Sequence, residues 1–188
     1  MHMFRASALL PQGRWLGAVA VWLVWCCAAW SADLKIEDFA GSYSGSAQVV
    51  RSSGEIEDRD LSVEISETDR GFRVSWRTTT YRASGGSRQK SYSIEFLPTQ
   101  RDGIFAAAMR KNVFGHSVQN DPMKGEPYVW ARIVGATMTV YSLFVDQQGD
   151  YELQEYARTR VEGGLEVKFK SLRDGQVARR VTAFLTQE

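Results

Sequence analysis

Apolar and polar residues alternate with a period of two through most of the chain beyond residue 40. The stretch 61–66 reads Leu-Ser-Val-Glu-Ile-Ser, and the stretches 72–77, 91–96 and 165–170 follow the same rule. Successive side chains of a β-strand point to opposite faces, so this pattern is typical of strands with one buried and one exposed face. The chain is therefore predicted to be all-β.

Short turn sequences separate the alternating stretches. The segments 69–71 and 173–175, for example, read Asp-Arg-Gly and Arg-Asp-Gly, and glycine in such a turn readily adopts a positive φ. Links of this length join antiparallel neighbours, because parallel neighbours need a crossover of about a dozen residues or more. The expected strands, about ten, are 42–50, 59–67, 71–81, 89–97, 103–109, 128–134, 136–145, 150–158, 164–171 and 177–186.

A meander of this size must bury its apolar face, either by closing into a barrel or by folding over as a sandwich. Nearly every connection has the length of a hairpin, whereas a sandwich needs Greek-key returns. We therefore expect an antiparallel up-and-down meander closed into a soluble barrel. The opposite face carries charged residues such as Glu95 and Lys168, which a lipid-facing surface would exclude, so an outer-membrane barrel is not expected.

Residues 1–32 have the features of a secretory signal. Two arginines, Arg5 and Arg14, form a basic segment before an apolar stretch, 16–30, that contains neither charge nor proline. Ala29 and Ser31 then place small residues where signal peptidase requires them. Cleavage would leave residues 33–188 as a single β-barrel domain in the periplasm or outside the cell. An uncleaved anchor is the alternative, because the apolar stretch approaches the length of a membrane span.

Composition outside this segment excludes several classes of function. Both cysteines, Cys26 and Cys27, lie within it, so the cleaved product would have neither a disulfide nor a cysteine-ligated metal. The remaining 21 basic and 22 acidic residues give no basic surplus of the kind that nucleic-acid-binding proteins show. No nucleophile, phosphate-loop or metal-ligand motif is present. We expect no enzyme activity, no metal and no nucleic-acid partner.

The segment 41–47, Gly-Ser-Tyr-Ser-Gly-Ser-Ala, resembles the opening of calycin-type barrels such as lipocalins, fatty-acid-binding proteins and nitrobindin-like proteins. There a short helical turn leads into a first strand with a Gly-x-Trp motif, and here Tyr43 stands in the place of the tryptophan. The resemblance implies a barrel that holds a small ligand. In lipocalins a basic residue late in the barrel packs across that tryptophan. Arg179 or Arg180, on the last predicted strand, would take this position here. The alternative is that Tyr43 and its glycines only begin a tightly curved strand.

The same resemblance bears on cofactors. Nitrobindin-like proteins bind haem through a histidine in the C-terminal part of the barrel, and this chain has no histidine after His116. No haem or other cofactor is therefore expected.

The predicted interior suggests a ligand site, because eight strands already leave room for one small molecule and ten leave more. Arg132 shares its alternation with Trp130 and would then point inward, where a carboxylate would be its natural partner. The alternative is an outward Arg132, with Val129, Ala131 and Ile133 buried. The candidate ligand-binding residues are Tyr43, Phe72, Trp76, Tyr92, Phe96, Trp130, Arg132 and Met138.

Two hypotheses of function follow. The first is an exported soluble barrel that binds a small apolar, amphipathic or lipid-like ligand in its interior, with the connection 110–127 as a lid over the mouth. The second is a non-enzymatic envelope interaction or structural protein whose barrel is filled by its own side chains. Its protein partner would contact the charged outer face or the same connection, which would then lie on the outside of the barrel. Contact with the membrane is expected only through the export signal.

Overall fold

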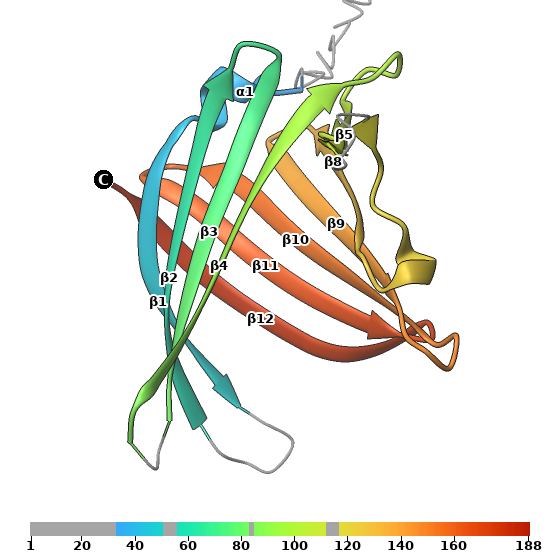
Figure 1. Cartoon of the computed structure of the whole chain (residues 1–188). Helices are drawn as coiled ribbons and strands as arrows, with labels where there is room; N and C mark the ends of the chain where they lie inside the picture. Colours follow the sequence, from blue (N-terminus) through green and yellow to red (C-terminus); the bar gives the residue numbers. More distant parts are fainter. Residues whose placement is uncertain (1–32, 51–55, 83–84, 112–116) are drawn as a thin grey trace, which may run out of the picture. The chain divides into compact units, whose positions relative to one another are not determined.

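The computed structural model describes residues 33–50, 56–82, 85–111 and 117–188, and these form a closed antiparallel β-barrel (Figure 1). The strand order around the barrel is β1-β12-β11-β10-β9-β8-β5-β4-β3-β2. Each barrel strand therefore pairs with the barrel strands before and after it along the chain, and β1 closes the ring against β12. The predicted all-β, up-and-down barrel is confirmed. The predicted signal segment, 1–32, and His116 lie outside the described residues.

Each of the ten predicted strands corresponds to one strand of the barrel. The largest differences are at β2, which begins three residues earlier because it pairs with β1 as far as Ile56, and at β10, which continues to Val161. The barrel strands are β1 (Gly41–Val50), β2 (Ile56–Thr68), β3 (Gly71–Tyr81), β4 (Ser87–Pro98), β5 (Ile104–Ala107), β8 (Tyr128–Val134), β9 (Thr137–Val145), β10 (Tyr151–Val161), β11 (Gly164–Arg173) and β12 (Gln176–Gln187).

The remaining elements are short. A four-residue helix, α1 (Ile36–Phe39), precedes β1. Between β5 and β8, β6 (Arg110–Lys111) and β7 (Ser117–Val118) form a separate two-stranded sheet, and a 3₁₀ turn, η1 (Pro122–Lys124), follows. Among the described residues, no helix has both the length and the apolar character needed to cross a membrane.

The turn between β11 and β12 illustrates the predicted hairpin chemistry. Asp174 and Gly175 have φ values of 48° and 79°, as a type I′ turn requires. Gly71 differs, because it has no positive φ. A Cβ at Gly71 would instead clash with the carbonyl oxygen of Phe96, so this glycine permits close packing of β3 against β4.

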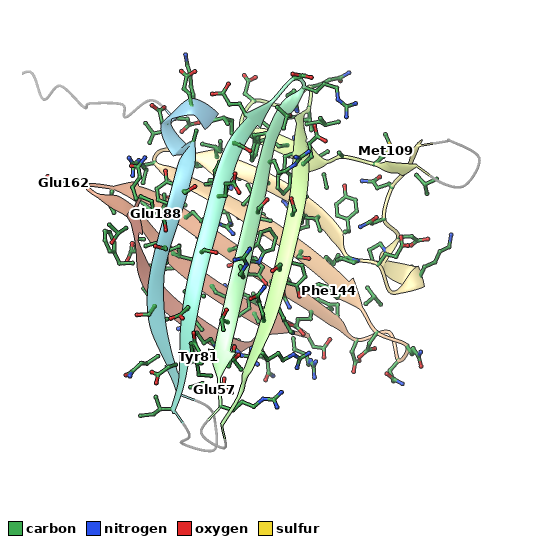
Figure 2. The ribbon with its side chains drawn as sticks, turned by 60° about the vertical axis from the view of Figure 1, so that its left-hand side comes forward. Glu57, Tyr81, Met109, Phe144, Glu162 and Glu188 are labelled. Atoms are coloured by element: carbon green, nitrogen blue, oxygen red, sulfur yellow. The ribbon has the colours of Figure 1, made fainter. Side chains whose placement is uncertain are left out.

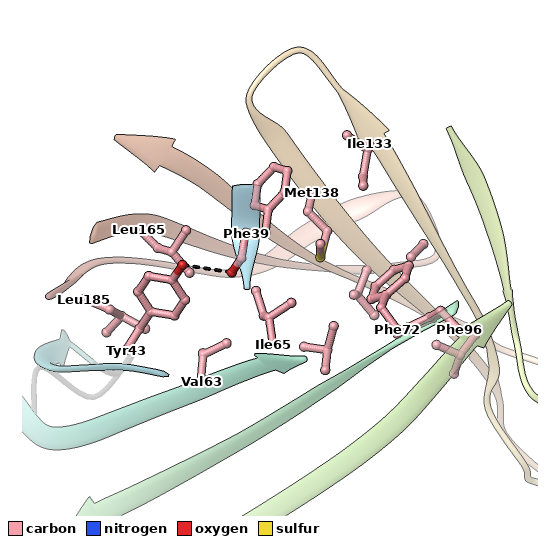
Figure 3. Packing of buried hydrophobic residues seen from close by; sticks show 14 of the residues in the cluster. Phe39, Tyr43, Val63, Ile65, Phe72, Phe96, Ile133, Met138, Leu165 and Leu185 are labelled. Atoms are coloured by element: carbon pink, nitrogen blue, oxygen red, sulfur yellow. Dashed lines mark hydrogen bonds between the residues drawn. The ribbon is translucent and has the colours of Figure 1, made fainter. Parts of the chain in front are cut away.

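The barrel has two unlike ends. The α1 end contains α1 and the β2–β3 hairpin, and the far end is where β2 begins at Ile56 and β3 ends at Tyr81 (Figure 1). Buried apolar side chains fill the α1 end, among them Phe39, Ile65 and Leu165 (Figure 3). The hydroxyl of Tyr43 donates a 2.8 Å hydrogen bond to the carbonyl oxygen of Phe39, which fastens α1 against the core.

Candidate ligand cavity

A cavity of about 970 Å³ occupies the barrel interior toward the far end. It borders the core at Val63 and Leu185 and extends past Glu57, which lies near the far end together with Tyr81 (Figure 2). This volume is at the upper end of the range typical of small-molecule sites. The barrel is therefore filled by its own side chains in one half and hollow in the other.

Aromatic rings from strands on opposite sides of the barrel, β3 and β4 on one side and β10 and β11 on the other, meet at the cavity. Trp76 of β3 stacks on Tyr92 of β4 with 5.2 Å between ring centroids. Tyr156 of β10 lies 5.5 Å from Trp76 and 4.8 Å from Phe169 of β11. Burial raises the pKa of Tyr156 to about 12, so its phenol stays protonated and donates a 2.8 Å hydrogen bond to Gln154 Oε1.

Arg158 lies on the same face of β10, two residues beyond Tyr156. Its side chain is only 1% exposed, and it lines the cavity. The guanidinium carbon is 5.4 Å from the ring centroid of Trp76 and 5.8 Å from that of Tyr156, distances that allow cation–π attraction. Burial lowers the pKa of Arg158 to about 10, so the side chain still carries its charge at neutral pH.

Polar groups replace apolar ones toward the far end. Arg59 Nη2 lies 2.7 Å from Glu57 Oε2, an ion pair that is nearly withdrawn from solvent. On the other side of the barrel, Glu152 accepts hydrogen bonds from Gln154 Nε2 at 2.8 Å and Ser171 Oγ at 2.7 Å. The cavity thus changes from an aromatic base, which also holds Arg158, to a polar mouth.

Glu152 remains ionised in this setting. Burial opposes its ionisation, but the hydrogen bonds from Gln154 and Ser171 and the positive charges of Arg173 and Arg179 outweigh that effect. The pKa of Glu152 is consequently below its ordinary value. Its carboxylate balances part of the positive charge at the far end.

The structure separates the predicted site residues into three groups. Trp76 and Tyr92 line the cavity and contact each other. Four others, which are fully buried, pack in the core at the α1 end instead: Tyr43, Phe72, Phe96 and Met138. The last two, Trp130 and Arg132, lie outside the barrel.

The prediction that Trp130 lines the interior is wrong, as is the inward alternative for Arg132. On β8 the buried residues are Val129, Ala131 and Ile133, so the intervening side chains face outward. Trp130 stacks on Tyr141 of β9 with 4.9 Å between ring centroids, and the two line a groove on the outer surface together with Arg132.

The basic residue that packs across Tyr43 is also different from the one expected. Arg160 holds that place, with its guanidinium carbon 5.7 Å from the centroid of the Tyr43 ring. Arg160 is near the end of β10, which finishes at the α1 end, where Tyr43 lies. Arg179 and Arg180 are in the first half of β12 and line the cavity toward the far end.

Tyr156 and Arg158 were not among the predicted site residues, because the inward face of β10 is the more polar of its two faces. The inward face carries Glu152, Gln154, Tyr156, Arg158 and Arg160, whereas the opposite face carries Tyr151, Leu153, Glu155, Ala157, Thr159 and Val161. Alternation alone therefore points Tyr156 and Arg158 outward.

The connection 110–127 provides no cavity residue among those described. Met123 of η1 is 80% exposed, and none of the described residues in this connection lines the cavity. Residues 112–116, which include part of the predicted lid, lie outside the described ranges.

Fold and cavity together define a closed, ten-stranded antiparallel barrel with an internal pocket, an arrangement that fits a calycin-like barrel. A solved structure of an S-type phycobiliprotein lyase, CPES, from Guillardia theta is similar, with a TM-score of 0.36 and 9% sequence identity over 81% of this chain and 90% of that chain. Similarity at this level assigns neither a ligand nor an activity. No family model and no curated protein sequence matches the chain.

Proposed function

We propose that this protein binds a small amphipathic molecule inside its barrel. The observation that carries the proposal is the cavity of about 970 Å³, which the aromatic rings of Trp76, Tyr156 and Phe169 line. Apolar pockets with a few convergent polar groups are the usual form of small-molecule sites. The role proposed is binding or transport of the ligand, without chemical conversion.

The character of the walls supports an amphipathic ligand in particular. Leu61, Val167 and Val181 join the aromatic rings on the apolar part of the wall. Arg158 and the Glu57–Arg59 pair supply polar contacts within the same space. A molecule with an apolar body and one polar group would satisfy both parts at once.

We also propose that the protein is exported to the periplasm or secreted. This part of the proposal rests on the signal-like sequence of residues 1–32.

Native mass spectrometry of the full chain, purified without denaturation, tests the proposal. We expect the native mass to exceed the mass after denaturation by on the order of a few hundred daltons, the mass of a typical small ligand. A bare native mass, together with no response to added amphiphiles, would contradict the proposal and favour an interaction protein whose partner contacts the outer surface.

Tryptophan fluorescence locates the bound molecule. We expect an added amphiphile to change the emission of the wild-type chain and of the Trp130→Phe variant, because Trp130 faces outward. The Trp76→Phe variant should lose most of that change, since Trp76 lines the cavity. Equal responses from the two variants would place the ligand elsewhere.

A further inference from the structure

Arg158 is a buried cation that lacks a carboxylate partner among the described residues. Its Nη1 donates a 3.2 Å hydrogen bond to the carbonyl oxygen of Tyr156, and its Nε has no hydrogen-bond partner. A buried charge is strongly destabilising unless it is paired and hydrogen-bonded. The attraction of the two aromatic rings offsets only part of that cost.

Arg160 provides an internal comparison, because it lies on the same face of β10. Its Nη1 donates to the carbonyl oxygen of Gly164 at 2.9 Å, and its Nη2 donates to Gln187 Oε1 at 2.6 Å. The fold therefore supplies acceptors for the partly exposed Arg160 and leaves the fully buried Arg158 with one.

We infer that the ligand is an amphipathic organic acid and that Arg158 binds its carboxylate. The inference rests on the proposed function, since it names the chemistry of the molecule held in the same cavity. A guanidinium presents five N–H donors in a planar fork that matches the two oxygens of a carboxylate. A carboxylate in the cavity would satisfy donors that the protein leaves unused and would neutralise the buried charge.

The charge distribution around the cavity agrees with an anionic ligand. Of the described residues that line it, eight are arginine or lysine and only Glu57 is acidic. Glu57 is paired with Arg59. Several of the cations are exposed at the far end, where they attract anions toward the mouth. These exposed residues are Arg82, Arg88, Lys90, Arg179 and Arg180.

The surroundings of Arg158 also accommodate the apolar part of the ligand. Val167 is directly opposite Arg158 on β11, and Trp76 and Tyr156 flank the guanidinium. A chain or ring attached to the bound carboxylate would lie against these side chains. The carboxylate would thus be deep in the barrel, with the apolar body extending along the aromatic rings.

Isothermal titration calorimetry of the full chain with dodecanoate and dodecanol tests the inference, because the two probes share one chain and differ in the head group. We expect the wild type to bind dodecanoate at least about tenfold more tightly, the usual effect of a charge-assisted hydrogen bond. Arg158→Met should abolish this preference while retaining the affinity for dodecanol. Arg158→Lys, which keeps the charge but loses the fork, should retain part of the preference.

Arg132→Met is the matched control, since Arg132 is an arginine on the outside of the barrel. It should bind both probes as the wild type does. If the wild type binds both probes equally, or if Arg158→Met keeps the preference for dodecanoate, the inference fails while the proposed function stands. If the wild type binds neither probe, both fail.

Discussion

Two arginines separated by one residue on β10 have opposite relations to their surroundings. Arg160 packs on the Tyr43 ring and donates hydrogen bonds to two acceptors, which connects β10 to β11 and to the end of β12. Arg158 is fully buried and makes one hydrogen bond. We therefore expect Arg160 to contribute to the stability of the barrel and Arg158 to lower it in the absence of a ligand.

This contrast predicts opposite effects of the same substitution. We expect Arg158→Met to raise the free energy of unfolding of the ligand-free protein by about 1 to 3 kcal/mol, because an apolar side chain of similar length replaces an unpaired buried charge. Arg160→Met should lower it by about 1 to 2 kcal/mol through the loss of two hydrogen bonds. Urea denaturation followed by far-UV circular dichroism measures both. A loss of stability in Arg158→Met as large as that in Arg160→Met would mean that Arg158 has a structural role.

At the scale of the elements, glycines determine how closely the strands approach where the barrel closes. Gly45 is in the middle of β1, and a Cβ at this position would clash with the carbonyl oxygen of Phe184 on β12. A Cβ at Gly164, at the start of β11, would likewise clash with the carbonyl oxygen of Leu185 on β12. Gly45, one of the small residues that resemble the start of a calycin barrel, is thus required by the packing of β12 over β1.

Gly45→Ala should consequently destabilise the barrel. We expect the free energy of unfolding to fall by about 1 to 3 kcal/mol, because the obstacle is backbone and cannot move aside as a side chain would. Ser46→Ala, an exposed position on the same strand, serves as the control and should change stability by no more than about 0.5 kcal/mol. Thermal or urea unfolding of the two variants makes the comparison. Equal stabilities would show that β12 can shift away from β1 at little cost.

At the scale of the whole barrel, apolar packing and charge are separated along its axis. The α1 end contains the packed core, including Phe39 and Tyr43. The far half encloses the cavity, which arginine and lysine side chains surround. A ligand that enters at the far end would meet positive charge first, then aromatic rings, and then Arg158 at the base.

Export can be tested on the whole chain in a bacterial host with a periplasm. We expect the intact mass of the envelope-fraction protein to correspond to a chain that begins at Ala32 or Asp33. Ser31→Leu should block cleavage and leave the full-length mass, because signal peptidase requires a small residue before the cut. A full-length mass for the wild type, in the membrane fraction, would instead indicate the uncleaved anchor.

The sequence by itself determined the strands and their antiparallel order, and it favoured closure of the sheet over a sandwich. Period-two alternation depends only on the geometry of a strand, and hairpin-length links leave few other topologies, so all ten strands were predictable. The same alternation put Trp76 and Tyr92 on one inward face, as the structure confirms.

Only the tertiary structure decided which face of an ambiguous strand is inside and how deep each residue lies. Both faces of β8 are rich in apolar residues, so alternation could not place Trp130 and Arg132 outside. On β10 the face opposite Arg158 is the more apolar one, so nothing local marked Arg158 as buried. Alternation specifies which side chains share a face. The direction of that face and the depth of each residue depend on strand tilt and stagger, which arise only when the whole barrel closes.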